Sequence, residues 1–518
     1  MRRVLLAMFL GIAMPCAAAD QTSRRIELDV DKAVEPVDRF FALSVGSDYP
    51  GTLIREDSQA HLAVAADELG FEYLRFHDLF HDTLGTVRHV DGAIVYDWTR
   101  IDQLYDALLA KGVRPFVELG FTPAALKTSD QSLFYWKANT SHPKPAMWRH
   151  LIDAYLRHVI AGYGVDEVRS WYFEVWNEPN LKDFWEGADR DAYFELYANT
   201  ARTLKAVDSR LRVGGPSTAG AAWIPEFLAF CDEEEVPIDF VTTHTYGVDG
   251  GFLDEQGGQD TKLLSSPGAI VADVRRARKE IDASAFPGLP LYFTEWSSSY
   301  SPRDVVHDSY INAPYVLTKL KQARGLAQGM SYWAYTDLFE EAGPPPASFH
   351  GGFGLMNREG VRKPTWFAYK YLNQLTGREI PTNDELAWAS VDERKITILA
   401  WDWQQPVQDV SNRPFYTRKL VARPAVPLSI HLKSIQPGSY RLKVHRTGYL
   451  KNDPLSAYID MGLPSDVSAV QLNALKSATS DQAEQDRMLR VGSDGLLDLD
   501  LAMRSNDVVL VTLEPLER

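Results

Sequence analysis

The sequence predicts a (β/α)8 TIM barrel followed by a C-terminal β-sandwich, and two features of the chain indicate this fold class. From Phe40 to about Leu375, short β-prone runs alternate with amphipathic helical stretches, as in parallel sheets with helical crossovers. Beyond Thr376 the chain changes to alternating, proline-punctuated runs, which are typical of antiparallel strands in a sandwich. An open doubly wound sheet is the rival architecture, but its Gly-x-Gly-x-x-Gly sequence does not follow the first strand.

Eight parallel strands can be counted in the first region, with helical stretches between them. The predicted strands are residues 41–45, 73–77, 114–119, 170–176, 211–215, 240–246, 291–295 and 330–335. The helix predicted for residues 58–69 places apolar side chains three and four positions apart on one face, and Gly70 ends the pattern. Residues 190–207 and 363–375 repeat this pattern. Eight such units close into a barrel whose active face is formed by the loops after the strands.

These patterns divide the chain into four parts. Residues 1–19 are a predicted signal peptide, 20–39 contain a strand expected to join the sandwich, 40–377 form the barrel and 378–518 form the sandwich. Because the later strands begin without a Ser/Gly-rich linker, we expect the barrel and the sandwich to share an apolar interface. A loop at residues 449–464 is also expected to approach the barrel.

The first residues of the chain favour export. Arg2 and Arg3 precede an apolar stretch and a run of small residues ending at Ala19, which predicts a signal peptide cleaved before Asp20. The protein is therefore expected to be secreted or periplasmic. A lipid anchor on Cys16 is the alternative, but the preceding Met-Pro is a poor lipidation context. Elsewhere the chain lacks the roughly 20 continuous apolar residues of a membrane span, so stable membrane insertion is not expected.

Composition narrows the classes of partner. The formal net charge is −16, and loss of two arginines with the signal peptide would make it −18, which disfavours nucleic acid and anionic polymers. The mature chain keeps one cysteine, Cys231, so its stability must come from packing. The 13 Trp, 23 Tyr and 23 Phe could stack on sugars, although large α/β cores also use many aromatic residues. The sequence carries no indication of oligomeric state.

Two carboxylates stand at the ends of apolar, β-prone runs. Residues 171–181 read Trp-Tyr-Phe-Glu-Val-Trp-Asn-Glu-Pro-Asn-Leu and place Glu178 at the end of a strand, while Leu-Tyr-Phe-Thr-Glu-Trp at 291–296 places Glu295 at another. A carboxylate beside apolar side chains is poorly solvated, and chains tolerate this where acid–base chemistry needs it. Glycosidic bond hydrolysis uses two opposed carboxylates. We therefore expect a glycoside hydrolase that needs no cofactor and no metal.

Four longer stretches carry a resemblance to a known family. They are Arg75-Phe-His-Asp-Leu-Phe-His-Asp82, Phe173-Glu-Val-Trp-Asn-Glu-Pro-Asn-Leu181, Phe349-His-Gly-Gly-Phe-Gly-Leu355, and 449–464 with Asn452, Tyr458 and Met461-Gly462. They resemble glycoside hydrolase family 39, the family of β-xylosidases and α-L-iduronidases, whose acids follow the fourth and seventh strands of a barrel. The resemblance spans nearly the whole mature chain. It implies hydrolysis by double displacement with retention of anomeric configuration.

The resemblance also implies roles for individual residues. Glu178 is the expected general acid and then base, and Glu295 is the expected nucleophile. Asn177 would bind the sugar 2-hydroxyl, His244 would line the site, and Tyr246 would orient the nucleophile. The resemblance further implies a sugar contact from an acid in residues 337–341, either Glu341 or alternatively Glu340. Apart from the resemblance, a sugar contact is expected from His77, and Phe121 and Trp333 are expected as apolar walls.

Some acidic and histidine residues in or near these motifs could instead bind a metal or form structural ion pairs. His77, Asp78, His81 and Asp82 lie within six residues and could suggest a metal site. The two histidines, however, are four positions apart at a strand-to-loop junction rather than on a helix, so a sugar contact from His77 is favoured. Two further acids, Glu118 and Glu174, lie inside β runs, and we expect them to pair with Arg75 or Arg114 as buried structural groups.

The sequence thus predicts a retaining, exo-acting, β-xylosidase-like hydrolase of plant or microbial oligosaccharides. The acidic chain and residues 349–355 favour a neutral glycone over iduronate, while Arg358, Arg362 and Lys363 keep the iduronidase alternative open. Other exo- or endo-glycosidases of the same fold, acting on arabinosides, galactosides or exopolysaccharide, are further alternatives. A carbohydrate-binding protein without activity is the rival from another class, but the chain retains both acids.

Overall fold

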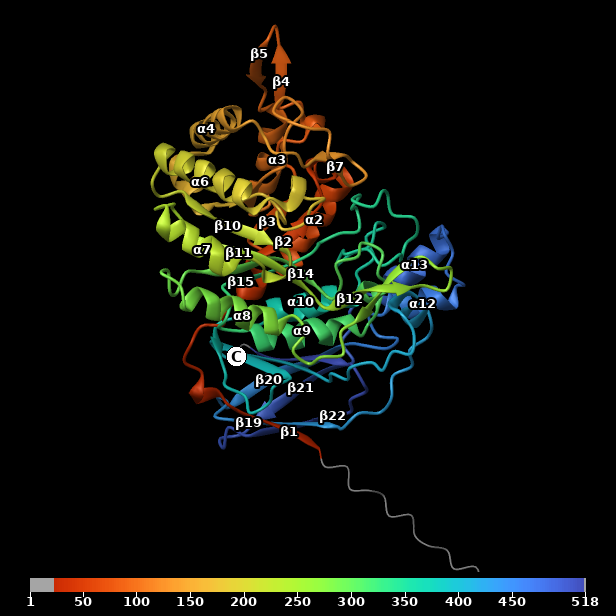
Figure 1. The fold of residues 1–518 in the computed structure, drawn as a ribbon. Helices are drawn as coiled ribbons and strands as arrows, with labels where there is room; N and C mark the ends of the chain where they lie inside the picture. The colour runs from red at the N-terminus through yellow and green to blue at the C-terminus, as the bar shows by residue number, and fades with distance from the viewer. Residues whose placement is uncertain (1–22, 517–518) are drawn as a thin grey trace, which may run out of the picture.

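A computed structural model of the chain describes residues 23–516, and its central element is a closed barrel of eight parallel strands (Figure 1). The barrel strands are β2 (Ser44–Ser47), β3 (Tyr73–Phe76), β6 (Arg114–Leu119), β9 (Tyr172–Val175), β10 (Arg212–Thr218), β11 (Phe240–Tyr246), β14 (Leu291–Ser297) and β15 (Gly329–Tyr332). Each strand pairs with the next one along the chain, and β15 closes on β2. The predicted barrel is confirmed, whereas the predicted signal peptide lies outside the described residues.

Some strand bounds differ from the prediction for local reasons. The first strand begins at Ser44 rather than at residue 41, because Phe40–Ala42 form a 3-10 turn. The Asp38 carboxylate accepts a hydrogen bond from the Phe40 backbone N–H (3.1 Å) and so favours this turn. The fourth strand begins at Tyr172 because helix α5 (Val165–Ser170) occupies the residues before it.

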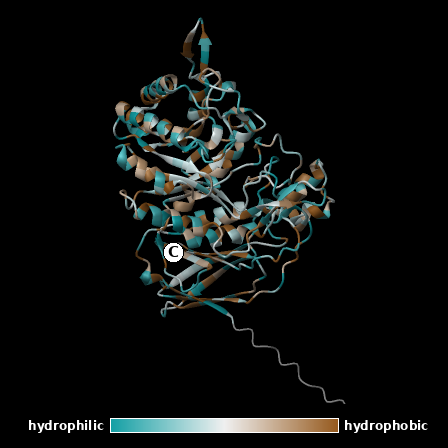
Figure 2. Ribbon diagram, viewed as in Figure 1, coloured by the Kyte–Doolittle hydropathy of each residue, from teal (hydrophilic) through white to brown (hydrophobic). Residues whose placement is uncertain are grey.

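Helices cover the outside of the barrel. They are α2 (Glu56–Leu69), α3 (Thr99–Leu109), α4 (Pro145–Tyr163), α6 (Arg190–Val207), α7 (Ile224–Glu233), α8 (Val271–Asp282), α9 (Asn312–Ala323) and α10 (Pro364–Asn373). In α2 the buried residues include Leu62, Ala65 and Leu69, and the helix ends at Gly70 with a left-handed φ of 70°. Polar and apolar residues alternate along these helices, as Figure 2 shows, because one face of each packs on the strands.

The end of the barrel that holds the strand N-termini is closed by aromatic side chains. Tyr73, Phe116, Tyr172, Phe240 and Tyr292 form a buried cluster there. The rings of Phe116 and Tyr172 stack with their centroids 4.8 Å apart. This packing leaves the opposite end, where the strands finish, for polar side chains.

The later part of the chain forms two sheets with a shared apolar core. One sheet has the order β16 (Arg378–Glu379), β17 (Ala387–Asp392), β18 (Lys395–Trp401), β23 (Val508–Pro515), β20 (Gly438–Thr447) and β21 (Gln485–Val491). The other is β1 (Arg24–Asp29), β19 (Leu428–Lys433) and β22 (Leu497–Leu501). The N-terminal strand β1 pairs in parallel with β19, and Ile26 belongs to the same apolar cluster as Ile430.

Three helices interrupt the later region, which the sequence pattern had assigned to strands and loops. They are α11 (Asn412–Tyr416), α12 (Pro454–Asp460) and α13 (Ala469–Ala478). Helix α13 begins with a capping box between Ser468 and Gln471, a signature that is visible in the sequence. In α12, Tyr458 packs on Phe349 of the loop after β15 with ring centroids 5.1 Å apart. Residues 449–464 therefore contact the barrel.

The smaller elements lie in the loops. They are α1 (Pro50–Leu53), the hairpins β4 (Val87–Val90)–β5 (Ala93–Tyr96), β7 (Ser132–Leu133)–β8 (Ala138–Asn139) and β12 (Val248–Leu253)–β13 (Gln259–Leu263), and short 3-10 turns at Val30–Lys32, Asp82–Leu84, Glu186–Ala188, Ala219–Ala221 and Val305–Asp308. The β4–β5 hairpin projects from the barrel at the top of Figure 1.

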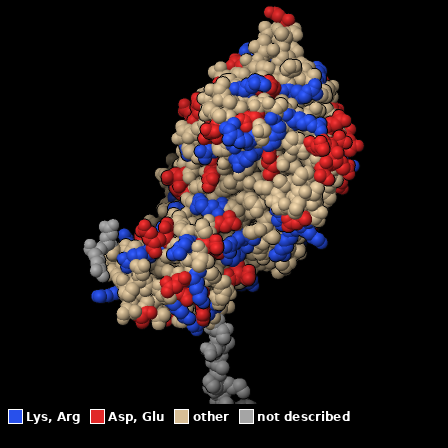
Figure 3. Space-filling view, turned by 90° about the vertical axis from the view of Figure 1, so that its left-hand side faces the viewer, with Lys and Arg blue, Asp and Glu red and all other residues tan. Residues whose placement is uncertain are grey.

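The helices of residues 23–516 include none that could cross a bilayer. Acidic and basic side chains intermingle on the face drawn in Figure 3.

The sandwich has its own core but also contributes side chains to the apolar core of the barrel. Trp388, Trp401 and Val508 of the sandwich belong to the cluster that fills the barrel's helical layer. The indole N–H of Trp401 donates to the Thr318 hydroxyl of α9 (2.9 Å), and Trp388 lies 6.3 Å from Phe41, centroid to centroid. The barrel therefore depends on the sandwich to bury part of its own apolar surface.

Removing residues 378–518 is expected to give an insoluble or strongly destabilised barrel. The truncation would expose the surface under Trp388 and Trp401 and remove the partner of strand β1. Soluble yield and thermal unfolding of a protein ending at Gly377 should be compared with those of the full chain. A soluble truncated protein with full activity and an unchanged melting temperature would show that the sandwich is an independent unit.

Candidate active site

A cavity of about 690 Å³ opens at the carboxyl ends of the barrel strands. Seven of the predicted site residues line it: His77, Asn177, Glu178, Tyr246, Glu295, Trp333 and Glu341. The other lining residues are mostly apolar: Leu133, Phe134, Leu181, Phe184, Ala219, Gly220, Asp273, Tyr300, Pro302, Ala342 and Phe353. The barrel thus brings together residues from loops that are far apart in the sequence.

Glu178 follows strand β9 and is held by an unusual backbone. Its φ is 46°, and the φ of Trp176 two residues earlier is 70°, so both residues lie in the left-handed region that side chains normally avoid. The Glu178 N–H donates to the carbonyl of Ser217 (2.8 Å), which anchors this turn to β10. The side chain is turned into the cavity and is only 10% exposed. Burial raises the pKa of Glu178 to about 7, although His77 and Arg75 oppose this rise.

Glu295 lies within strand β14 and receives two charge-bearing or polar donors. Arg75 Nη1 donates to its Oε1 (2.7 Å), and the Tyr246 hydroxyl donates to its Oε2 (2.7 Å). Burial raises the pKa of Glu295, and the Arg75 guanidinium partly offsets this effect. Both oxygens are engaged by donors, which is the arrangement that an ionised carboxylate needs.

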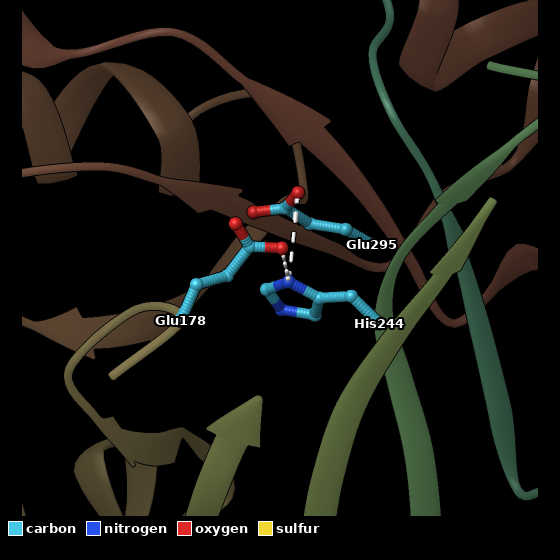
Figure 4. A group of neighbouring side chains, drawn as sticks. All are labelled: Glu178, His244 and Glu295. Atoms are coloured by element: carbon cyan, nitrogen blue, oxygen red, sulfur yellow. Dashed lines mark hydrogen bonds and ion pairs between the residues drawn. The ribbon is translucent and has the colours of Figure 1, made fainter. Parts of the chain in front are cut away.

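Glu178, His244 and Glu295 meet at the end of the barrel, as Figure 4 shows. One carboxylate oxygen from each acid and one ring nitrogen of His244 all lie within 4.8 Å of one another. His244 Nδ1 is 2.9 Å from Glu178 and 3.7 Å from Glu295. His244 is fully buried and supports Glu178 from behind without lining the cavity.

Arg75 connects the residues beneath the cavity, although the sequence pattern does not predict a place for it in the site. Its guanidinium donates to Glu174 (2.6 Å) and Asn177 (2.7 Å) and lies 3.0 Å from Glu118. The expected pairing of Glu118 and Glu174 therefore forms with Arg75, while Arg114 binds Glu167 instead (2.8 Å). The place of Arg75 at the start of the first family motif was the available signal.

His77 bridges two acids at the cavity wall. Its Nδ1 lies 2.7 Å from Glu118 and its Nε2 lies 3.2 Å from Glu341. Although burial opposes it, these carboxylates hold the pKa of His77 well above its usual range, so the ring is cationic. Glu340 points elsewhere and binds Arg55 (3.0 Å), which leaves Glu341 as the acid of this loop that lines the cavity.

Phe121 was predicted to form an apolar wall of the cavity, but it does not line the cavity. It is fully buried behind the wall, with its ring 5.2 Å from Trp176 and 6.1 Å from His77, centroid to centroid. Phe134 takes the place in the wall, and it does so from a backbone with φ of 64° in the turn between β7 and β8. A left-handed phenylalanine has no sequence signature, so this contact could not be read from the chain.

The groups considered for metal binding serve separate partners. His81 contacts the Trp136 carbonyl (2.9 Å), Asp78 accepts from the Phe121 N–H (3.0 Å), and Asp82 accepts from the Ala124 N–H (3.1 Å). These contacts fix the loop after β3 to the loop after β6. The cluster of residues 77–82 therefore organises the cavity wall.

The basic residues that kept the iduronidase alternative open lie outside the cavity. Lys363 is fully buried and its ammonium lies 2.6 Å from Asp308 and 2.7 Å from Asp337. It also donates to the carbonyl of Gly352 (2.9 Å), so it holds the loop that carries Phe353. Arg362 pairs with Glu68, and Arg358 pairs with Glu359 (2.6 Å). Among the described residues, the lining of the cavity contains no Lys or Arg.

A closed (β/α)8 barrel with two acids at the ends of its fourth and seventh strands defines a glycoside hydrolase. The chain belongs to glycosyl hydrolases family 39, whose family model matches residues 24–495. The resemblance found in the sequence motifs is thereby confirmed.

Relatives and solved structures agree with this assignment. The chain is 35% identical over 499 residues to a β-xylosidase of Caldicellulosiruptor saccharolyticus, covering 95% of this chain and 98% of that protein. It is 25% identical over 487 residues to an α-L-iduronidase of Mus musculus, covering 83% and 71%. The structure of the family 39 enzyme from Xanthomonas axonopodis pv. citri superposes with a TM-score of 0.95 at 68% identity, covering 95% and 98%. That of a monomeric β-xylosidase from Caulobacter crescentus CB15 has a TM-score of 0.94 at 63% identity, covering 96% and 100%.

Proposed function

We propose that this chain is an exo-acting β-xylosidase that hydrolyses terminal units of plant or microbial oligosaccharides with retention of configuration. The observation that carries the proposal is the opposition of Glu178 and Glu295, which have oxygens within 4.8 Å of each other but very different surroundings. Retaining enzymes place these carboxyl groups about 5–5.5 Å apart, whereas inverting enzymes leave about 6.5–9.5 Å for a water. The close approach supports retention.

The first step uses the two acids in opposite protonation states. Glu295, held by Arg75 and Tyr246, attacks the anomeric carbon while Glu178 gives its proton to the departing glycosidic oxygen. The bond to the leaving oxygen breaks and a bond from Glu295 to the sugar forms. A pKa of about 7 keeps much of Glu178 protonated near neutral pH, which suits this role.

The second step reverses these roles. Glu178, now a carboxylate, takes a proton from water as the water oxygen attacks the anomeric carbon and Glu295 departs. The side-chain carbonyl oxygen of Asn177 accepts a hydrogen bond from Arg75. The NH2 group of Asn177 is therefore left to donate to the sugar 2-hydroxyl. His77, Glu341 and Trp333 are the proposed remaining contacts of the sugar, because they line the same cavity.

The charges of the cavity support a neutral glycone. Glu178, Glu295, Glu341 and Asp273 line it, and His77 is the cation among the lining residues described. A carboxylate-bearing sugar would meet acidic groups without the arginine or lysine that would recognise it. Two relatives named as β-xylosidases, at 35% and 63% identity, support a xyloside within this class. The predicted signal peptide supports action outside the cytoplasm.

A panel of aryl glycosides tests the proposed specificity. The β-xyloside should give a kcat/KM at least about tenfold above those of the α-arabinoside, β-galactoside and β-glucoside, since one or two misplaced ring substituents in a fitted pocket have about this effect. An α-L-iduronide that is hydrolysed faster than the xyloside would overturn the assignment. Saturable binding of all these sugars without turnover would favour the carbohydrate-binding alternative.

The pH dependence should follow Glu178. Its proton-donating form is present below its pKa of about 7 and is lost as the pH rises through that value. The kcat/KM for a xyloside with a poor leaving group should therefore fall on the alkaline side, with an inflection near pH 7. A profile that stays flat to pH 9 would contradict a general acid with this pKa.

Replacement of Glu178 by Gln should separate substrates by leaving group. Unactivated xylosides need a proton on the departing oxygen and should lose about 10²- to 10⁴-fold in kcat/KM, whereas a dinitrophenyl xyloside should form the glycosyl-enzyme at nearly the normal rate. Stopped-flow release of dinitrophenol measures that first step. Glu340→Gln removes a nearby carboxylate that points to Arg55 and serves as the matched control. Equal losses on both substrates would show that Glu178 is not the acid.

The nucleophile is tested by stereochemistry and by chemical rescue. An NMR time course should show xylose released first as the β-anomer, the configuration of the substrate. Glu295→Gly should be almost inactive and should regain turnover with azide, forming a glycosyl azide of inverted configuration. A 2-fluoro xyloside should label Glu295, and mass spectrometry of peptides locates the adduct. Release of the α-anomer first would exclude double displacement.

A further inference from the structure

Four buried polar groups form a chain that ends on Glu178. The Thr294 hydroxyl of β14 lies 2.7 Å from Glu174 Oε1 of β9. His244 Nε2 of β11 lies 3.2 Å from the same hydroxyl, and His244 Nδ1 lies 2.9 Å from Glu178 Oε1. Glu174, Thr294 and His244 have no exposed surface, so their polar atoms must form hydrogen bonds with other protein groups rather than with bulk water.

The donor and acceptor in each of these hydrogen bonds can be assigned by starting at Glu174, the group farthest from Glu178. Glu174 also accepts from Arg75 Nε (2.6 Å), and although burial opposes it, this guanidinium lowers the pKa of Glu174. Glu174 is therefore an ionised carboxylate, which can only accept. The Thr294 hydroxyl has a single proton, which it donates in the hydrogen bond to Glu174. The oxygen of Thr294 must then act as the acceptor toward His244.

The tautomer of His244 follows from this count. Nε2 must carry a proton in order to donate to Thr294. Burial lowers the pKa of His244 to about 4, so the ring is neutral near pH 7 and has only this one N–H. Nδ1 is consequently an unprotonated acceptor that faces Glu178 at 2.9 Å. An ionised carboxylate at that position would set two acceptors against each other.

We propose that Thr294 and Glu174 are positioning residues that fix the tautomer of His244 and thereby keep the proton on Glu178 in the free enzyme. The inference rests on the proposed acid and base roles of Glu178. In the first step the proton of Glu178 passes to the leaving oxygen, and the resulting carboxylate faces the lone pair of Nδ1. That repulsion increases the basicity of Glu178 when it must take a proton from water in the second step.

Other charged groups around His244 and Glu178 also influence which of the two carries the proton. The titratable and charged groups that face His244 and Glu178 are Arg75 and His77 from the end of β3, Glu118 from β6, Glu174 from β9, Tyr246 from β11, Glu295 from β14 and Glu341 from the loop after β15. Burial and two cations, Arg75 and His77, oppose a positive charge on His244, and together they outweigh Glu295 and Glu174, which favour it. The proton between His244 and Glu178 therefore lies on the carboxyl oxygen.

Thr294→Val tests whether Thr294 fixes the tautomer of His244, because the substitution keeps the side-chain shape and removes the hydroxyl. Without that acceptor, His244 should move its proton to Nδ1 and donate to an ionised Glu178, which favours loss of the acid's proton. The alkaline inflection of kcat/KM should shift down by about one pH unit, so kcat/KM for a poor leaving group should fall about fivefold at pH 7 and about tenfold at pH 8. Thr294→Ser retains the hydroxyl and should keep the wild-type inflection.

Substrate choice separates this effect from simple damage to the site. A dinitrophenyl xyloside does not need the acid, so Thr294→Val should form the glycosyl-enzyme from it at nearly the wild-type rate. Equal losses on both substrates, or one inflection shared by wild type, Thr294→Val and Thr294→Ser, would overturn the proposal. If Glu178 were not the acid, Glu178→Gln would already give equal losses, so failure of the proposed function is distinguishable.

The tautomer can also be measured directly in the unmodified protein. In protein labelled with ¹⁵N-histidine, the His244 resonances are identified by their loss in His244→Gln. Wild type should show an unprotonated Nδ1 and a protonated Nε2 at pH 6. A protonated Nδ1, either in the other neutral tautomer or in an imidazolium, would overturn the proposal even if Thr294→Val failed to fold.

Discussion

The buried guanidinium of Arg75 is the constraint on which the catalytic end of the barrel depends. It has no exposed surface and lies against Glu118, Glu174 and Glu295, which come from three different strands. An isolated charge at this depth would cost several kcal/mol, so the carboxylates and the arginine must remain together. Since one of the partners is the proposed nucleophile, the group that stabilises the barrel floor also sets the position of the reacting oxygen.

The two acids differ because their neighbours differ. Glu295 faces donors on both oxygens, from Arg75 and Tyr246, whereas Glu178 faces the ring of His244 and an apolar wall. Carboxyl groups of equal intrinsic acidity can therefore hold opposite protonation states a few ångströms apart. The strained turn around Glu178 serves the same end, because it directs this side chain toward Glu295 instead of toward solvent.

The outer parts of the molecule support the walls of the cavity. Lys363 holds the loop that carries Phe353, and α12 of the sandwich packs Tyr458 on Phe349 of the same loop. In α11, Asn412 donates to Asp304 (2.8 Å) in the loop after β14. The later domain thus acts on the site through packing and hydrogen bonds on loops, although it contributes no residue to the cavity lining among those described.

The sequence by itself determined the barrel, many of its elements and the two acids. Strands β6 and β11 and helix α6 have the bounds that their apolar periodicity predicts, because periodicity is a local property. The motifs also predicted Tyr246 as a neighbour of Glu295, and its hydroxyl donates to Glu295 Oε2. Other surroundings of the acids were decided by the tertiary structure alone. Arg75 meets Glu295 across 220 residues of sequence, Phe134 replaces Phe121 in the wall through a left-handed turn, and α12 and α13 form where strands and loops were expected. Closing the barrel makes neighbours of distant strand ends, and the burial and proton order that result have no local signature in the chain.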